Sequence, residues 1–416
     1  MMFSSIGYFG IFDTIQLLCY FIMVYCSILW FIVFIKNHYK FFVDKPIKNY
    51  PSVTFLIPAY NEKKFLPKCI NSVLNLDYPK NKIKIICIND GSTDKTSEIC
   101  KNIKNQRVIV INKKNTGKAD SLNTALKLVD TEFVVSMDAD SFPKKDYLKK
   151  IIGHFDNKEI AAISPAMKIN KPQTFMQQIQ WVEYIFSIYL RKLFAIFDCQ
   201  YVLPGPGSIY RTDKLKKIGG WDKHSLVEDT ELAFRMYEKG YKIENCINAY
   251  VNTESPATFK ELFRQRVRWY RGYLQTTLQY KHLLGNSKYG NLGLFILPIN
   301  FAWIFILGFL FFMPLYTFIK NFLEYLHTLY LVGFEWSKWT LNFDILYVSS
   351  YSYFFVLFFL MGIITVLLSL YTSGEKIDFK TKKIFYFGYL FIYPFLYSIF
   401  WIAAVVYEIF KIDNKW

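Results

Sequence analysis

The chain has 416 residues, of which 53% are apolar, 19% aromatic and only 20% charged. This composition excludes a disordered chain, a collagen-like chain and a small disulfide scaffold, and it holds less charge than an ordinary soluble enzyme. The net charge of +17 comes entirely from residues 36–292, because the segments on either side sum to zero. We therefore expect a basic domain in water and apolar segments in lipid.

Four stretches have the roughly 20 apolar residues that a transmembrane helix needs: Ile11–Ile35, Leu292–Ile319, Leu346–Tyr371 and Ile384–Phe410. Lysines follow the first stretch and lie between the third and the fourth, so the positive-inside rule predicts that the large middle segment is cytoplasmic. We expect a multi-pass protein of the cell membrane. Residues 1–35 would form one transmembrane helix, residues 36–291 a cytosolic domain, and residues 292–416 three further transmembrane helices.

The middle segment alternates apolar runs with helix-like segments. Its β-branched runs are Val53–Ile57, Ile83–Ile88, Val108–Ile111 and Phe133–Met137. The helix-like segments begin near Glu62, Asp94, Lys118 and Asp146. This alternation predicts an α/β fold with a mainly parallel sheet, in which ligands bind beyond the carboxyl ends of the strands. The loops that directly follow the strands are therefore the place to look for a site.

Two carboxylates, Asp138 and Asp140, follow the strand Phe133–Met137. Hard oxygen ligands of this kind suit Mg²⁺ or Mn²⁺. The alternative is a solvated turn, which would be the better interpretation of two such acids if the motif stood alone. The position at a strand end favours the metal site.

The loop after the second strand and the start of a later helix carry further candidates. Asp90 can accept a hydrogen bond from the imide N–H of a uracil ring, although a plain capped turn is the alternative for this loop. Lys118 opens a helix, where its ammonium and the helix dipole would both favour a nucleotide phosphate. Gly117 and Lys118 do not belong to a P-loop motif.

The order of these motifs resembles that of inverting family 2 glycosyltransferases with the Rossmann-like GT-A fold. Val227–Glu228–Asp229 and Gln265–Arg266–Val267–Arg268–Trp269 are similar to two motifs of the membrane-embedded processive branch, which makes cellulose, chitin, hyaluronan and poly-N-acetylglucosamine. The resemblance covers about residues 50–275 by motif. One predicted span before the domain and three after it resemble bacterial poly-β-1,6-N-acetylglucosamine synthases most.

The resemblance implies a role for each matching residue. Tyr60, Glu62 and Asp90 would hold the uridine, and Lys118 the nucleotide side of the donor. Asp138 would contact the ribose–phosphate region, and Asp140, with Asp138, the metal. Asp229 would be the general base, with Glu228 beside it. The donor diphosphate and the acceptor sugar would be bordered by Gln265, Arg266, Arg268, Trp269, Gly205 and Gly207.

Elementary chemistry agrees with this division of roles. Inverting transfer needs one base within reach of the acceptor hydroxyl, and positive charge to neutralise the departing diphosphate. Glu228 would raise the proton affinity of Asp229, as like charges do. The alternatives are structural: an acidic pair is also favourable at a helix start, and Trp269 has the properties of a core residue.

Two amphipathic segments, near residues 173–198 and 258–284, are predicted to lie at the cytoplasmic leaflet. In the first, the polar side is formed by Gln177, Gln180, Glu183, Ser187 and Arg191. The alternative for both segments is an ordinary core helix.

The sequence thus predicts a processive β-glycosyltransferase that transfers a sugar, N-acetylglucosamine, from a UDP-sugar to a growing polysaccharide and exports it. Its expected partners are the UDP-sugar, the polysaccharide acceptor, membrane lipid and a small accessory membrane subunit, but no nucleic acid. Two alternatives stay open at this point. One is a single transfer to a polyprenyl-phosphate lipid, and the other is a non-enzymatic membrane scaffold with a degenerate domain.

Overall fold

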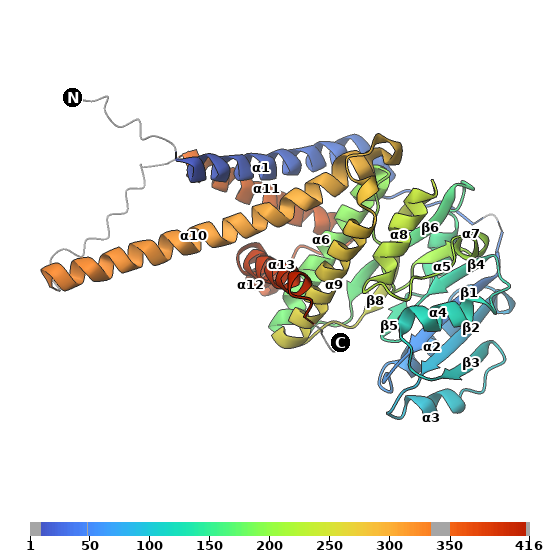
Figure 1. The fold of residues 1–416 in the computed structure, drawn as a ribbon. Coiled ribbons are helices and arrows are strands. Elements are labelled where there is room, and N and C mark those ends of the chain that lie inside the picture. Colours follow the sequence, from blue (N-terminus) through green and yellow to red (C-terminus); the bar gives the residue numbers. More distant parts are fainter. Residues whose placement is uncertain (1–9, 48, 334–349, 413–416) are drawn as a thin grey trace.

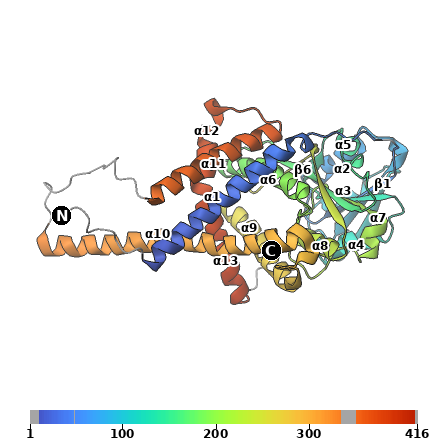
Figure 2. The same ribbon diagram turned by 90° about the horizontal axis from the view of Figure 1, so that it is seen from above.

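The computed structural model describes residues 10–47, 49–333 and 350–412. Figure 1 shows a sheet domain at one end, with the long helices α1 (Ile11–Asn37) and α10 (Leu297–Val332) extending away from it. Figure 2 shows the same arrangement from above, with α6 (Phe175–Ile196) next to the sheet and α9 (Phe259–Gln279) overlapped by α10.

The sheet has eight strands in the order β3-β2-β1-β4-β7-β6-β8-β5. The four predicted strands are present as β1 (Val53–Ala59), β2 (Ile83–Asp90), β3 (Val108–Lys113) and β4 (Phe133–Ser136), and they pair in parallel. The others are β5 (Ser141–Pro143), β6 (Ile160–Ile169), β7 (Ile209–Arg211) and β8 (Lys242–Thr253). β7 runs antiparallel to both β4 and β6, and β5 is antiparallel to β8, so the sheet is mixed.

Both faces of the central strands are buried, which explains their continuous apolar sequences. Phe55 packs in the core beneath α2 (Leu66–Leu74) and α5 (Tyr147–Ile152). Its neighbour Leu56 points to the opposite core, beneath α4 (Lys118–Leu126) and α8 (Glu228–Glu238). Two short helices, α3 (Thr96–Lys101) and α7 (Thr212–Lys217), complete the domain. The predicted α/β fold is confirmed.

Three described helical segments are long and apolar enough to cross a membrane: Ile11–Lys40, Leu292–Leu331 and Phe379–Ile409. The last consists of α12 (Phe379–Phe387), a π-helical turn and α13 (Tyr393–Ile409). The predicted span Leu346–Tyr371 begins outside the described residues. The rest of it forms most of α11 (Ser350–Thr372), whose apolar part, Val356–Thr372, is shorter than the other three segments.

The helices α6 and α9 occupy the two predicted amphipathic segments. Each begins with a capping box, Thr174 with Gln177 and Thr258 with Glu261, in which side chain and backbone satisfy each other's hydrogen bonds. The predicted polar side of α6 does not lie open to solvent, however, because Gln180 is fully buried and donates to the carbonyl of Pro256. Gln177 also donates to a carbonyl of the segment before α9, that of Ser255, and Glu183 pairs with Arg266 of α9 itself.

Candidate active site

Lys118 lies at the centre of the site. Its Nζ is 2.7 Å from Asp138 Oδ1 and 3.0 Å from Glu228 Oε1. These residues come from the start of α4, the loop after β4 and the start of α8, three elements far apart in sequence. Folding therefore brings three of the predicted site residues into direct contact, with Asp229 beside them in the chain.

The predicted glycine loop lies against this ion pair. A Cβ atom at Gly205 would be 2.5 Å from Lys118 Nζ and 3.1 Å from both carboxylate oxygens of Asp138, so a side chain there would displace this ion pair. Ser136 Oγ donates to the Gly205 carbonyl at 2.9 Å, and the Gly207 N–H donates to the Ser136 carbonyl at 2.8 Å. The end of β4 thus holds the loop over the site.

The two carboxyls at the start of α8, those of Glu228 and Asp229, have pKa values shifted in opposite directions. Burial works against ionisation of Glu228, but Lys118 outweighs it and lowers the pKa of this carboxyl. Burial, followed by the charge of Glu228, raises the pKa of Asp229 to about 6. Asp229 Oδ1 accepts from the Thr230 N–H at 2.7 Å. Two adjacent carboxyls therefore differ in proton affinity, which is the property that separates a base from a permanent charge.

A second group of acids lies beyond the strand ends. Burial and Asp138 raise the pKa of Asp140 to about 6, and burial, Asp140 and Asp138 raise that of Glu62 to about 7. Among the described residues, no group of three or more His, Cys, Asp or Glu side chains could hold a metal ion. The mutual repulsion of these acids nevertheless fits a divalent cation that takes one or two carboxylates and completes its shell with ligand oxygens.

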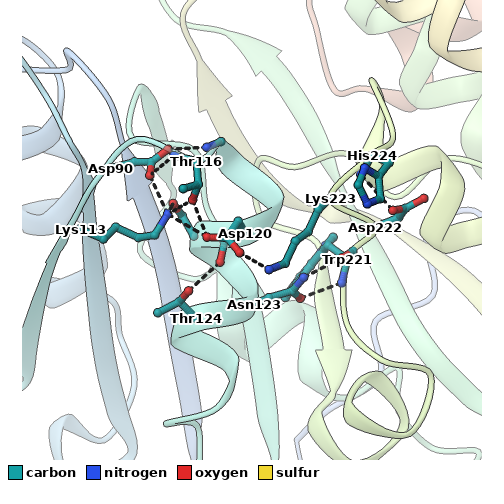
Figure 3. A network of polar contacts seen from close by, with 12 residues as sticks. Asp90, Lys113, Thr116, Asp120, Asn123, Thr124, Trp221, Asp222, Lys223 and His224 are labelled. Carbon is teal, nitrogen blue, oxygen red and sulfur yellow. Dashed lines mark hydrogen bonds and ion pairs between the residues drawn. The ribbon is translucent and has the colours of Figure 1, made fainter.

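Asp90 ends β2 and organises the loop before α4 (Figure 3). It accepts from the N–H groups of Thr116 (3.1 Å) and Gly117 (2.9 Å), and Lys113 Nζ lies 2.8 Å from its Oδ1. Gly117 has a φ of +94°, which favours glycine. The predicted uridine residue is thus also the anchor of the loop that presents Lys118.

Asp120 and Asn123 extend this network to the segment that leads into α8 (Figure 3). Asp120 forms ion pairs with Lys113 and Lys223. Asn123 exchanges two hydrogen bonds with the backbone of Trp221, at 2.6 and 2.9 Å. No role was predicted for these residues from the sequence, although Asp120 lies only two residues after Lys118.

The loops after β1 and β2 are also joined. The Glu62 N–H donates to Thr96 Oγ1 at 2.8 Å, and the Thr93 N–H donates to Asn61 Oδ1 at 2.9 Å. Tyr60 lies in the first of these loops and is 48% exposed. It is open to a ligand at this edge of the sheet.

The motif on α9 divides between two environments. The Arg266 guanidinium is fully buried, 2.6 Å from Glu183 of α6, and stacks at 4.2 Å on the ring of Trp269. Gln265 Oε1 accepts from Arg266 at 2.9 Å. Arg268 lies instead beside the start of α8, where its Nη1 donates to the Leu226 carbonyl at 3.2 Å. Of the two arginines, only Arg268 therefore lies near the cluster of Lys118, Asp138 and Glu228.

Comparison with known proteins agrees with this arrangement. A family model described as glycosyl transferase family 2 matches residues 54–219. The chain is 28% identical over 382 residues to the probable glycosyltransferase YdaM of Bacillus subtilis. This match covers 88% of this chain and 83% of that protein. It is 27% identical over 403 residues to a poly-beta-1,6-N-acetyl-D-glucosamine synthase of Staphylococcus epidermidis, covering 92% and 91%.

Among solved structures, the chain is similar to the mannosyltransferase PcManGT of Pyrobaculum calidifontis in complex with GDP-Man and Mn²⁺. The TM-score is 0.57 at 15% identity, and the match covers 95% of this chain and all of that one, 100%. This likeness shows the fold, and the family match shows the enzyme class. The chain is therefore a glycosyltransferase with the GT-A fold, in which residues 54–219 match the family 2 model.

Proposed function

We propose that this glycosyltransferase is processive and inverting, and that it adds N-acetylglucosamine from a UDP-sugar to a growing β-linked polysaccharide. The observation that carries the proposal is the contact of Lys118 with both Asp138 and Glu228, which places Asp229 next to the residues proposed to bind the donor. The similarity to poly-beta-1,6-N-acetyl-D-glucosamine synthase over most of both chains supports the choice of sugar and polymer.

The donor would lie across the carboxyl ends of β1, β2 and β4. In this proposal Tyr60, Glu62 and Asp90 contact the uridine, and Lys118 and Asp138 contact the ribose and phosphates. Asp90 already accepts three hydrogen bonds from its own protein, so its contact with the base would use the remaining lone pairs of its carboxylate.

Asp140, with Asp138, would hold a Mg²⁺ or Mn²⁺ ion, and the Mn²⁺ in the structurally similar mannosyltransferase supports this assignment. Such an ion, when bound, would neutralise the negative charge of the donor diphosphate. Arg268, beside the start of α8, would add a positive charge on the other side of the same group.

Asp229 would act as the base. Its ionised carboxylate would take the proton of the acceptor hydroxyl while the hydroxyl oxygen attacks the anomeric carbon of the donor sugar. The bond from that carbon to the phosphate oxygen would break, and UDP would leave with the electron pair. Because attack and departure occur on opposite faces of the sugar, the anomeric configuration inverts.

The acceptor would lie between the Gly205–Gly207 loop, Gln265 and Trp269, at the side of the domain that faces α9 and the membrane helices. Arg266, buried against Glu183, would hold α9 in place for this contact. In this proposal the protein lies in the cell membrane with residues 36–291 on the cytoplasmic side. The polymer would leave between the four spans. Lipid and a small accessory subunit would complete that path.

The test uses membranes that carry the protein, incubated with a panel of labelled UDP-sugars with and without Mg²⁺ or Mn²⁺. Wild type is compared with Asp229→Asn and with Asp213→Asn, an exposed aspartate on α7 that serves as the matched control. We expect ethanol-insoluble label from one donor, dependent on metal, present in the control and absent in Asp229→Asn. Label found only in a chloroform-soluble lipid would instead establish single transfer and refute the proposed polymerase.

A further inference from the structure

α9 touches the segment before the proposed base at two positions one helical turn apart. Arg268 Nη1 donates to the Leu226 carbonyl at 3.2 Å. At Gly272, a Cβ atom would lie 2.6 and 2.7 Å from the two methyl groups of Val227 and 3.2 Å from Leu226 Cβ. The backbone of α9 at Gly272 is thus in direct contact with Val227, with no room for a side chain.

Val227 is the residue from which α8 begins. Its carbonyl accepts from the N–H groups of Thr230 and Glu231 at 3.2 and 3.1 Å, the first hydrogen bonds of the helix. Val227 is buried and β-branched, so it cannot give way by a rotamer change as a flexible side chain could. A displacement of Val227 would therefore move the start of α8, where Glu228 and Asp229 lie.

α9 itself is fixed from the other side by α13. Glu408 accepts from Arg271 Nε and from Gln275 Nε2, each at 2.8 Å. The ring of Tyr270 stacks on that of Trp401, with 4.6 Å between centroids and 4° between planes. Because these contacts flank Gly272 on α9, the helix cannot easily step back from Val227.

We infer that Gly272 is a positioning residue, which lets α9 approach Val227 closely enough to set the place of Asp229 at the start of α8. Glycine is a poor residue for a helix interior, and here the close contact gives a reason for it. The inference rests on the proposed function, because it takes Asp229 as the base.

The experiment compares Gly272→Ala with Gly308→Ala in the full-length protein. Gly308 lies inside α10, and apart from its own helix no described atom would lie within 4 Å of an added Cβ. The second variant therefore makes the same helix-favouring change without a collision. For each, kcat and the donor KM are measured, together with UDP binding in the presence of Mn²⁺. The double variant Gly272→Ala/Val227→Ala removes the two methyl groups that collide.

We expect Gly272→Ala to lower kcat by about 10- to 100-fold, as a displacement of a catalytic group on the order of 1 Å does. Donor KM and UDP binding should stay within about twofold, because Lys118 and Asp138 come from the start of α4 and the loop after β4, which an added Cβ at Gly272 would not contact. The double variant should recover most of the lost kcat. Gly308→Ala should match wild type.

A wild-type kcat in Gly272→Ala would overturn the inference, and so would an equal loss of kcat and UDP binding that the double variant does not repair. Turnover by Asp229→Asn at the wild-type rate would refute the base assignment itself. Failure of the positioning role is thus seen in Gly272→Ala and its double variant, and failure of the base assignment in Asp229→Asn.

Discussion

The paired carboxyls at the start of α8 make the pH dependence of this enzyme a sensitive test of the site. Burial and the charge of Glu228 raise the pKa of Asp229 to about 6. A base is active when ionised, so a raised pKa means that activity is present above pH 6 and is lost as the pH falls through it. Replacing Glu228 with Gln removes the like charge, and frees Lys118 to act more strongly on Asp229. Both changes lower the pKa of the base.

The expected size of the effect follows from the ionised fraction. With a pKa of about 6, the base is roughly one-tenth ionised at pH 5 and nine-tenths ionised at pH 7. A like charge a few ångströms away shifts a carboxyl by on the order of one to two pH units. Glu228→Gln should therefore raise the rate at pH 5, relative to the same variant's rate at pH 7, by about five- to ninefold over wild type.

The assay measures kcat/KM for the donor between about pH 4.5 and 8 in wild type, Glu228→Gln and Glu238→Gln. Glu238 ends the same helix and contacts His282 rather than the site, so its replacement controls for the loss of one negative charge from α8. An acid limb that stays in place in Glu228→Gln, or that moves to higher pH, would show that Asp229 is not the group that titrates.

Three further predictions concern the surroundings of the base. Glu183→Gln leaves the buried Arg266 guanidinium without its partner and should destabilise the protein by about 3–5 kcal/mol, seen as a lower melting temperature in detergent; an unchanged melting temperature would contradict a buried ion pair. Asp140→Asn should raise the Mn²⁺ concentration needed for half-maximal rate at least about tenfold, and a titration curve identical to wild type would remove Asp140 from the metal site. Asp120→Asn breaks the ion pair with Lys223 and should raise donor KM several-fold with a smaller change in kcat; steady-state kinetics would count against this if only kcat fell.

The sequence was sufficient to predict the first half of the domain. Its four parallel strands are buried on both faces, so each appears in the sequence as a continuous apolar run. The acids that follow these runs mark the strand ends. The antiparallel β7 could not be predicted, because its three residues, Ile209–Arg211, are too few to show a pattern. The pairing of β7 with β4 and β6 depends on contacts far along the chain.

The site was predicted by motif, but its internal contacts were not. The resemblance named Lys118, Asp138 and Glu228 separately, and only the fold shows that one ammonium joins the two acids. The sequence predicted α6 at the cytoplasmic leaflet or, as the alternative, in the core, because helical periodicity shows that a face is polar and not what it faces. In the structure this face meets α9, where Glu183 binds Arg266.

The length of α10 has a consequence for what lies across the bilayer from the sheet domain. Its 36 residues extend about 54 Å, whereas the hydrocarbon layer is about 30 Å thick. Lys320 and Glu324, in the C-terminal half of the helix, form an exposed ion pair with N and O 3.7 Å apart, and charged side chains are costly in the hydrocarbon layer. If α10 spans the membrane as proposed, its C-terminal part would extend into water beyond the far leaflet, where antibodies, proteases and reagents that cannot cross the membrane would reach it.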